Sequence, residues 1–501
     1  MNPKAWLTLS FVGCGWGHLP KGGDVTLSGA TWDPTSAVAR EDAVLLHLPA
    51  SGGVVSLTGT TPTSVETAGY ATQLVASTRT NHVAALTEKY RCTAPEDEID
   101  GELVYASDCP SEYLQIDRGF TVVHGEQAGD SFEFDSPYAH LAFSPTGDTA
   151  VAWLSSVDEI PDDSIVNLAA AAVIDLESGA IFSLDVGYGA SEVLFTDDGT
   201  RAVVLSQNRV TVLDIGSNPP TKDVSFSLTL DADNTLVPSR VALTPDGSHA
   251  LITVQGQADL YILDLENPSV NLVSLPAVPA DMVVDPLSDR TLIVYSNSAV
   301  VDLLDHDVFD LESTLLDEPA THIDLLADFA LLSRPGSTDV VWFSPSEQDS
   351  HEFHLQGGLV RLQTSPTADR AVAFTEVGGA PGMEILNLET LDNPAPYLLP
   401  SASQDAAFST ADGATHLLVL QSSESSLLSM NLTEGGLEEI QLPDNPLSIG
   451  SLEEGGFYIT HQSSSGRVSF FDPASGNIET ASGFAWSNLS SQPLLESSEA
   501  E

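Results

Sequence analysis

The sequence predicts an all-β chain in which repeated units pack side by side into a ring. The same pattern of short apolar strands recurs with a period of about 40–50 residues, the length of one four-stranded repeat. Turns that contain Asp-Gly or a related pair separate the first two strands of many repeats. No stretch has a 3.6-residue periodicity over the length of a helix. We therefore expect a β-propeller of four-stranded blades, with seven to ten blades in one ring.

The repeat is clearest at residues 191–214 and 239–264. Each of these segments has an alternating strand, a turn with Asp-Gly, an apolar second strand and a third strand that ends in Leu-Asp. Asp-Gly supplies the positive φ of a tight hairpin turn, and short β-branched runs are typical of strands. Because so few strands cannot bury a face alone, the repeats must pack against one another.

Weaker copies of the repeat extend in both directions. Eight units are counted from Pro137 onward, and two poorer ones precede them at residues 25–68 and 70–125. The middle of the chain contains no linker, so we expect one ring rather than two separate propellers. A strand from the N-terminal segment usually closes such a ring, and Asp24–Leu27 is the candidate for it.

Three turn sequences resemble those of known propeller repeats: Ser144–Gly147, Thr196–Gly199 and Thr244–Gly247. They are similar to the turn of YVTN-type and TolB (PD40)-like, WD40-like β-propellers. The resemblance covers residues 137–472 and is closest at Leu251–Asp285. It implies the propeller architecture, which we assign to residues 24–486. It implies no activity, since enzymes, binding proteins and scaffolds share this repeat.

Residues 1–14 have the features of an export signal. Lys4 precedes a short apolar run, Ala5–Gly13, in the charged-then-apolar order of a secretory signal. This run is too short to span a bilayer. Phe11–Cys14 resembles the lipobox of bacterial lipoproteins, in which the cysteine is lipidated and becomes the mature N-terminus; a buried N-terminal strand is the alternative. The resemblance implies an exported protein of the cell envelope, either an outer-membrane lipoprotein or one of the periplasm or cell surface.

The cysteines support export. The chain has three, and lipidation of Cys14 would leave Cys92 and Cys109 as a pair. A disulfide between them requires an oxidising compartment, and it would stabilise the fold by about 3 kcal/mol in the chain-entropy model. Two unpaired buried thiols are the alternative. A zinc site is not expected, because no His or third Cys lies at the required spacing.

The charge of the chain excludes two classes of partner. Asp and Glu number 72 against 16 Lys and Arg, a formal net charge of −56. Such a surface repels nucleic acid and anionic lipid, so we expect contact with a membrane only through a lipid anchor. Adaptation to a salty habitat and attraction of cationic partners both explain the charge, and we favour the habitat. The Ser/Glu-rich residues 487–501 are expected to be a disordered acidic tail.

Acidic clusters are the candidate cation sites. Oxygen ligands suit Ca²⁺, although no cluster has the Gly and Glu of an EF-hand loop, and a solvated acidic loop is the alternative. No other cofactor is expected. His351 and His354 lie three residues apart on a predicted strand and so point to opposite faces, where they would not chelate together. The weak Ca²⁺ candidates are Asp158, Asp162, Asp163, Asp231 and Asp233.

The sequence favours a binding role over an enzymatic one. It contains no Gly-x-Ser-x-Gly, no His-Glu-x-x-His and no glycine-rich phosphate loop. We expect a monomeric, non-enzymatic envelope scaffold that binds a protein, peptide or glycan. Its candidate contact loops are the inserts at 92–109 and 154–168. Their acidic residues are Glu96, Asp97, Glu98, Asp158 and Glu159.

An envelope enzyme is the alternative function. A lactonase-like hydrolase would need ionisable groups that converge at one mouth of the central channel. Carboxylates at strand ends, such as Glu192 and Asp285, are candidates for that role. His140, His249 and His322 lie near first or second strands of their repeats and are candidates to line the channel, with simple solvation there as the alternative.

Overall fold

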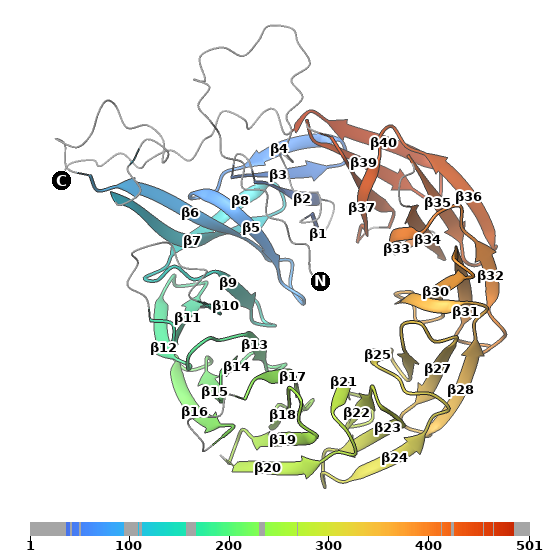
Figure 1. Cartoon of the computed structure of the whole chain (residues 1–501). Coiled ribbons are helices and arrows are strands. Elements are labelled where there is room, and N and C mark those ends of the chain that lie inside the picture. The colour runs from blue at the N-terminus through green and yellow to red at the C-terminus, as the bar shows by residue number, and fades with distance from the viewer. Residues whose placement is uncertain are drawn as a thin grey trace, which may run out of the picture.

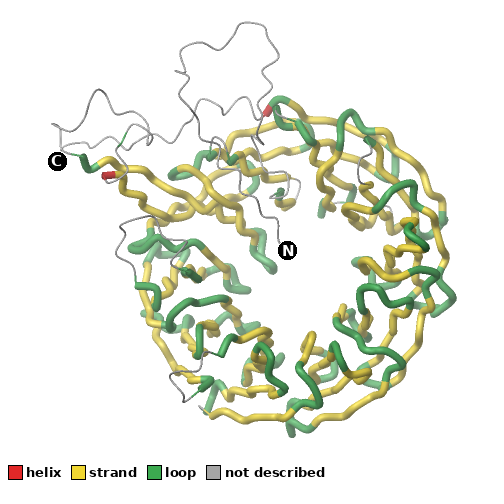
Figure 2. The backbone as a smooth tube through the Cα atoms, in the orientation of Figure 1, coloured by secondary structure: helices red, strands yellow, loops and turns green. Residues whose placement is uncertain are grey.

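The structure is a computed structural model of the 501-residue chain. Its described residues form ten four-stranded antiparallel sheets. The sheets stand as blades around a common axis, as Figures 1 and 2 show. The protein is a ten-bladed β-propeller, at the upper limit of the range that the sequence predicts. The described residues are 37–40, 43–49, 52–94, 109, 113–156, 167–229, 236–267, 269–411, 413–421, 425–453, 455–463 and 465–484.

The blades follow one another in chain order, and each begins with its innermost strand (Figure 1). Blades 1–3 contain β1 (Val38–Arg40), β2 (Ala43–Leu48), β3 (Gly53–Thr58), β4 (Thr61–Val65); β5 (Tyr70–Ala76), β6 (Val83–Cys92), β7 (Leu114–His124), β8 (Gln127–Glu133); β9 (His140–Phe143), β10 (Thr149–Trp153), β11 (Ala170–Asp175) and β12 (Ile181–Asp185). Blades 4–6 contain β13 (Glu192–Phe195), β14 (Arg201–Ser206), β15 (Arg209–Asp214), β16 (Thr221–Ser227); β17 (Pro238–Leu243), β18 (His249–Val254), β19 (Asp259–Asp264), β20 (Ser269–Ser274); β21 (Pro279–Asp285), β22 (Arg290–Tyr295), β23 (Ser298–Asp305) and β24 (Leu311–Leu315). Blades 7 and 8 contain β25 (His322–Leu325), β26 (Ala330–Ser333), β27 (Asp339–Ser344), β28 (Asp349–His354); β29 (Gly358–Thr364), β30 (Arg370–Val377), β31 (Ala380–Asn387) and β32 (Ala395–Leu398). Blades 9 and 10 contain β33 (Ser403–Ala411), β34 (Ala414–Gln421), β35 (Ser426–Asn431), β36 (Gly436–Gln441); β37 (Pro446–Ser451), β38 (Phe457–His461), β39 (Arg467–Asp472) and β40 (Asn477–Ser482).

The core lies between the blades. Val203 and Val204 are consecutive residues of β14, and both are fully buried. Val203 packs with residues of blade 5, whereas Val204 packs with residues of blade 3. Successive side chains of a strand point to opposite faces, so a strand covered on both faces is apolar throughout. This explains why the second and third strands of the repeats are continuous apolar runs.

The predicted Asp-Gly turns are confirmed. Gly247 has a φ of +68°, a conformation that L-residues rarely adopt. Asp246 stabilises the turn because its Oδ1 accepts hydrogen bonds from the Thr244 hydroxyl at 2.6 Å and from the Ser248 amide at 3.0 Å. The same geometry recurs at Asp198 and Gly199 in blade 4.

The ring closes by side-chain packing in the part of the chain that the structure describes. The four described strands of blade 10 all come from the C-terminal segment. Val44 and Leu46 of β2 pack against Val468 of β39 and against Phe484. The predicted closing strand, Asp24–Leu27, lies outside the described residues. No helix in the described ranges has the length and hydrophobicity needed to cross a membrane.

Candidate functional site

The antiparallel blades give the ring two different faces. Neighbouring strands of a blade run in opposite directions. On one face of the ring the first and third strands of every blade begin and the second strand ends. We call this the first face, and it also carries the connections from blade to blade. The opposite, second face carries the turns between strands one and two and between strands three and four. The predicted contact loops at 92–109 and 154–168 connect second to third strands, so they leave the blades on the first face.

One position of the innermost strand carries a polar side chain in nine consecutive blades, blades 2 to 10. It pairs with the second strand near the first face, and an apolar residue follows it each time. In six blades a shift in strand register lies directly before it, and such bulges re-aim the next side chain. We call this set the polar register: Gln73, His140, Glu192, Arg240, Asp281, His322, Arg361, Asp405 and Ser448.

Four blades bring ionisable members of the polar register together. The Nη2 atom of Arg240 lies 3.4 Å from Oδ1 of Asp281, and Oδ2 of Asp281 lies 3.1 Å from Nδ1 of His322. The other ring nitrogen of His322, Nε2, is 3.4 Å from Oδ1 of Asp324 on the same strand. Glu192 in blade 4 interacts electrostatically with Arg240. We call these five residues the charge cluster, and it extends across blades 4 to 7.

Asp281 is the buried centre of the charge cluster. Its side chain is only 5% exposed. Its Oδ1 accepts a hydrogen bond of 3.0 Å from the amide of Met282, and its Oδ2 accepts one of 3.0 Å from the amide of Ile323 in the next blade. A buried carboxylate is stable only when its oxygens are paired. The two amides, together with Arg240 and His322, provide that pairing and join blade 6 to blade 7.

Two carboxyl groups of the charge cluster have altered acidity. Burial raises the pKa of Asp324, an effect that His322 opposes and Asp281 reinforces. The Oδ2 atom of Asp324 is buried and has no hydrogen-bond partner among the described residues. Burial also raises the pKa of Glu192, against the opposing charge of Arg240. Both carboxyl groups therefore hold a proton at higher pH than ordinary carboxyl groups do.

The charge cluster is buried at its centre and open at its ends. The side chains of Arg240 and His322 are 56% and 54% exposed. They are the groups that an incoming molecule meets first, with Asp281 fixed behind them. The guanidinium of Arg240 has N–H groups beyond the one that faces Asp281, and these can donate hydrogen bonds to acceptor groups of a ligand. Cationic groups of a ligand can bind the carboxylates of Glu192 and Asp324.

The contact between neighbouring blades recurs in blades 8 to 10. Arg361 lies 3.7 Å from Oδ1 of Asp405 and donates a hydrogen bond of 3.1 Å to Oγ of Ser403. Like Asp281, Asp405 accepts from the amide that follows it, that of Ala406, and from an amide of the next blade, that of Ile449 at 3.2 Å. Burial lowers the pKa of Arg361, and Asp405 opposes this shift. The repetition indicates that the Asp residues of the polar register align adjacent inner strands.

A cavity of about 320 Å³ adjoins Asp405 near the seam between the last and first blades. Its lining includes Gln404, Ser448 and Tyr458. Tyr458 is almost fully buried and donates a hydrogen bond of 3.3 Å to the carbonyl oxygen of Ala37 in blade 1. Burial raises the pKa of this phenol, and Asp405 adds to the shift. The polar register thus borders a hollow at the first-face ends of blades 9 and 10.

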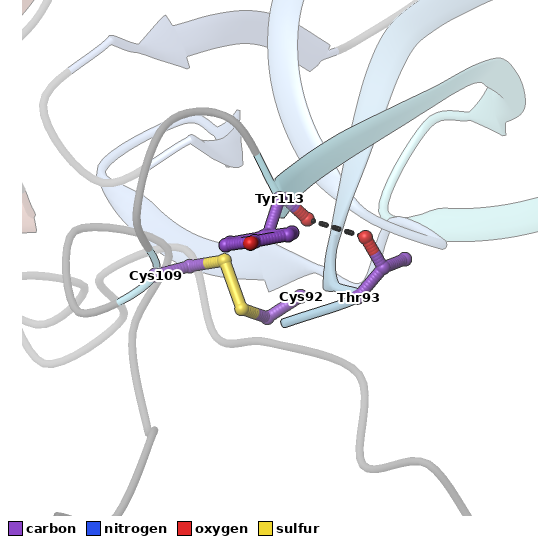
Figure 3. The surroundings of a disulfide bond; sticks show 4 residues. All are labelled: Cys92, Thr93, Cys109 and Tyr113. Carbon is purple, nitrogen blue, oxygen red and sulfur yellow. Dashed lines mark hydrogen bonds between the residues drawn. A yellow bond between two sulfur atoms is a disulfide. The ribbon is translucent and has the colours of Figure 1, made fainter. Parts of the chain in front are cut away.

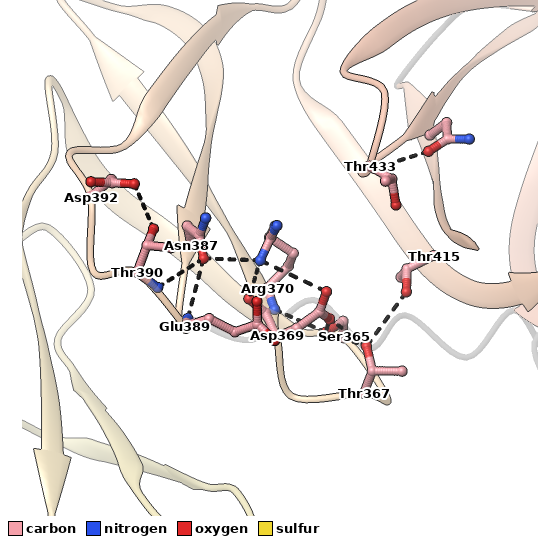
Figure 4. A network of polar contacts seen from close by, with 11 residues as sticks. Ser365, Thr367, Asp369, Arg370, Asn387, Glu389, Thr390, Asp392, Thr415 and Thr433 are labelled. Atoms are coloured by element: carbon pink, nitrogen blue, oxygen red, sulfur yellow. Dashed lines mark hydrogen bonds and ion pairs between the residues drawn. The ribbon is translucent and has the colours of Figure 1, made fainter. Parts of the chain in front are cut away.

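Polar residues on the second face serve the turns. In blade 8, Asp369 accepts hydrogen bonds from Thr367 and from Ser365, the latter at 2.9 Å (Figure 4). Although burial alone would raise the pKa of Asp369, these two hydroxyls lower it. Arg370 donates to Oδ1 of Asn387 at 2.9 Å and thereby ties the first turn of the blade to the second (Figure 4). All of these contacts stabilise the second-face turns of blade 8.

Two of the three predicted channel histidines lie on innermost strands. His322 belongs to the charge cluster, and His140 stacks on Trp153 with a ring-to-ring distance of 5.5 Å. His249 does not line the axis of the ring, because it begins the second strand of blade 5 on the second face and packs against Phe309.

Glu192 and Asp285, the two carboxylates named as candidates at strand ends, lie on different faces of the ring. Glu192 begins its inner strand on the first face, whereas Asp285 ends its inner strand on the second face. Asp285 accepts hydrogen bonds from the Leu287 amide and the Ser288 hydroxyl, so it serves a turn. The two carboxylates lie at opposite ends of the ring and cannot act on one ligand.

His351 and His354 lie on β28, the outermost strand of blade 7. His351 contacts Phe353 edge-on, and Nδ1 of His354 lies 2.6 Å from Oδ1 of Asp339. Asp339 raises the pKa of His354 through this contact. Within the described ranges, no group of three or more His, Cys, Asp or Glu residues is arranged to hold a metal ion.

The predicted disulfide is present. Cys92 and Cys109 are bonded, with their Cα atoms 5.7 Å apart. Figure 3 shows the bond beside the ends of β6 and β7, where the amide and the hydroxyl of Thr93 both donate to the carbonyl oxygen of Tyr113 at 2.9 Å. The disulfide thus closes the predicted contact loop of blade 2 at its base, on the first face.

The other predicted site residues lie outside the described residues. They are the lipidation candidate, the acidic residues of the contact loops and the Ca²⁺ candidates. In chain order these are Cys14, Glu96, Asp97, Glu98, Asp158, Glu159, Asp162, Asp163, Asp231 and Asp233.

Sequence reasoning missed most of the polar register. Arg240, Asp281, Arg361 and Asp405 were not singled out, because each lies in a different repeat and in no recognised motif. The signal that could have found them is the position of each residue within its repeat. When the repeats are aligned on the turns that follow their inner strands, Arg240, Asp281 and Arg361 fall in one column, five residues before Pro245, Pro286 and Pro366, and Asp405 lies five residues before Thr410.

Comparisons with known proteins concern the fold alone. No family model matches the chain, and no curated protein matches it. Among solved structures, the dihydro-heme d1 dehydrogenase NirN in complex with DHE is 9% identical with a TM-score of 0.40, over 68% of this chain and 80% of that one. A eukaryotic initiation factor is 14% identical with a TM-score of 0.49, over 81% and 96%. Apo AztD from Citrobacter koseri is 14% identical with a TM-score of 0.37, over 63% and 92%.

Proposed function

We propose that this protein is a non-enzymatic binding scaffold of the cell envelope, a monomeric lipoprotein anchored through Cys14. The partner is a protein, peptide or glycan that binds the first face. The single observation that carries this proposal is the charge cluster, in which four consecutive blades present ionisable groups at one end of the ring. Rigid strands position these groups, and the connections between blades lie on the same face.

The pairing within the charge cluster favours recognition over reaction. Asp281 is held by two amides and two side chains, so its geometry is set before a ligand arrives. Preorganised groups bind without the entropic cost of ordering flexible side chains. Arg240 and His322 remain half exposed and supply the contact groups.

Cross-linking with variants on each face tests the binding site. The full chain is cross-linked in envelopes of the producing cell, and the captured species are compared between wild type and the double variant Arg240→Gln/His322→Gln. The matched control is Glu266→Gln/Glu389→Gln, in which two exposed carboxylates of second-face turns are neutralised. A species captured by wild type and control but lost from the first-face variant supports the proposal. A species captured equally by all three contradicts it.

Intact mass tests the anchor. Wild-type protein and Cys14→Ser are isolated from the membrane and soluble fractions of an expressing bacterium. The proposal requires a diacylglycerol-sized increment on the wild-type chain and its loss in the variant. A wild-type chain that starts at Met1 and carries no lipid contradicts the anchor. The cross-linking experiment tests the binding site independently of this result.

A lactonase-like hydrolase is the second candidate. Its specific support is His322, whose two ring nitrogens lie 3.1 Å and 3.4 Å from the carboxylates of Asp281 and Asp324. A histidine oriented by one carboxylate can act as a general base through its other ring nitrogen, which here requires the substrate to displace Asp324 from Nε2. Hydrolysis of γ-butyrolactone by wild type, with its loss in His322→Gln and its retention in Glu266→Gln, would support this function. A wild-type rate equal to the buffer blank contradicts this assignment.

A further inference from the structure

The outermost strand of each blade has one edge without a strand partner (Figure 1). Free N–H and C=O groups on such an edge can pair with a strand of another chain, and proteins usually block this with charges or proline. Nine of the ten outermost strands in the described residues carry such a block. The blocking residues are Pro62, Asp130, Glu133, Asp185, Lys222, Asp223, Glu312, Asp349, Glu352, Pro396, Glu438, Glu439 and Glu479.

The outermost strand of blade 5 is the exception among these strands. β20 has the sequence Ser-Val-Asn-Leu-Val-Ser, with neither a charge nor a proline. It pairs with β19 along its whole length, from Ser269 to Ser274, so its backbone is a regular strand. Val270 and Leu272 are 48% and 52% exposed, and because they are two residues apart they lie on the same face of the sheet. The edge therefore combines a regular backbone with an apolar surface.

Carboxylates stand at both ends of β20. Asp259 lies opposite Ser274 and accepts a hydrogen bond of 3.1 Å from its hydroxyl. Asp264 lies opposite Ser269 at the other end. Its Oδ1 accepts hydrogen bonds from the amides of Glu266 and Asn267, which keep this carboxylate ionised. The uncharged strand is thus bordered by negative charge at each end.

We propose that β20 is the docking site for an extended peptide segment of another protein, which adds to blade 5 as a fifth, antiparallel strand. The segment has uncharged β-branched residues in its centre and Lys or Arg at both ends. The central residues cover Val270 and Leu272, and the basic ends pair with Asp259 and Asp264. Backbone hydrogen bonds provide the affinity, and the side chains of the segment determine the specificity.

A second copy of this chain fits the edge less well. Antiparallel pairing of two β20 strands places the Ser269 end of one copy beside the Ser274 end of the other. Neither Asp259 nor Asp264 then gains a cationic partner, because β20 contains no Lys or Arg. Each copy also carries a formal net charge of −56. Charge complementarity therefore selects a basic partner.

Peptide binding to the full chain tests the proposal. Ser274 and Asp259 lie on the same face of the sheet as Val270 and Leu272, whereas Ser269 and Asp264 lie on the other face. The probe is therefore a fluorescein-labelled peptide with the sequence Lys-Thr-Val-Thr-Val-Lys, whose binding is followed by fluorescence anisotropy. We expect Val270→Thr/Leu272→Thr, which keeps the strand and removes the apolar contacts, to raise the Kd about tenfold. The matched control is Leu315→Thr on β24, where the side chain is 82% exposed on a strand that Glu312 already protects. This control should bind the peptide as wild type does.

Four further measurements fix the mode of binding. A peptide with N-methylated valines cannot form the edge hydrogen bonds and should not bind, and a peptide with Glu in place of both Lys should bind more weakly than the probe. Equal binding of either peptide, or an unchanged Kd in Val270→Thr/Leu272→Thr, overturns the proposal. So does a dimer of the wild-type chain in sedimentation equilibrium that this variant abolishes. Arg240→Gln/His322→Gln should leave the Kd unchanged, which separates this site from the first face.

Discussion

Asp281 of blade 6 and Ile323 of blade 7 are joined by a hydrogen bond of 3.0 Å from the amide of Ile323 to Oδ2 of Asp281. The carboxylate also accepts from the amide of Met282 and is almost fully buried. The same relationship joins Asp405 to Ile449 at 3.2 Å in blades 9 and 10. One side chain therefore sets the spacing between the innermost strands of two blades.

Removal of this carboxylate should destabilise the ring. We expect Asp281→Ala to lower the free energy of unfolding by about 2–3 kcal/mol, because two amides lose their buried acceptor. Asp281→Asn retains one acceptor oxygen and should lose less. Calorimetric unfolding measures both changes. The control Arg240→Gln breaks only a half-exposed ion pair and should change stability by about 0–1 kcal/mol. An Asp281→Ala variant as stable as wild type would show that the contact between blades is not needed.

Tyr295 should stabilise blade 6 through its hydroxyl. This hydroxyl donates a hydrogen bond of 2.5 Å to Oδ2 of Asp302, which is 1% exposed, and Ser313 donates to Oδ1 at 2.6 Å. We expect Tyr295→Phe to cost about 2 kcal/mol, since a buried carboxylate loses a donor. Denaturant unfolding measures the change, and Tyr188→Phe, at a half-exposed tyrosine, is the matched control. Equal losses in the two variants would contradict this role.

Asp324 should make stability depend on pH in an unusual direction. Its pKa is raised mainly by burial, so the protonated form is favoured in the folded chain. The associated stability is fully present below the pKa of an unfolded Asp, about 3.9, and is lost as the pH rises through the higher folded value. We therefore expect Asp324→Asn to raise the Tm relative to wild type at pH 7 and to raise it less at pH 4. A Tm difference that is the same at both pH values would rule out ionisation as its cause.

The disulfide should stabilise blade 2. We expect Cys92→Ser/Cys109→Ser to lower the free energy of unfolding by about 3 kcal/mol, because the unfolded chain gains conformational freedom. Thermal unfolding with and without dithiothreitol measures this contribution. Dithiothreitol should lower the Tm of wild type and leave that of the double variant unchanged. A wild-type Tm that does not respond to the reductant would contradict the prediction.

The architecture was predictable because it depends on local chemistry. The turn at Asp246 and Gly247 requires residues that tolerate positive φ, and such residues recur in the matching turns of blades 3 and 4, at Gly147 and Gly199. Blades 1 and 2 were harder to recognise, since Glu41–Asp42 and Ser77–His82 connect their first two strands without an Asp-Gly pair. The blade number was therefore predicted as a range, and the structure gives ten.

The charge cluster was not predictable from any one segment. Arg240, Asp281 and His322 are about forty residues apart in sequence, each in its own repeat and each with different chemistry. Only the stacking of blades brings Arg240 to 3.4 Å and His322 to 3.1 Å from Asp281. The exposed edge of β20 was not predictable for a similar reason. Its lack of a charge or a proline is notable only when β20 is compared with the outermost strands of the other blades.

The seam between blades 10 and 1 has a mechanical consequence. In the described residues, this seam is held by apolar side chains and by the contact of Tyr458 with Ala37, without a strand shared between the two blades. Tension applied between the two ends of the chain acts directly on this seam. Packed side chains separate by peeling, whereas strands within a sheet resist as a hydrogen-bonded ladder. Under force the ring should therefore open into an arc at this seam first, and the blades should then unravel one after another from the free ends.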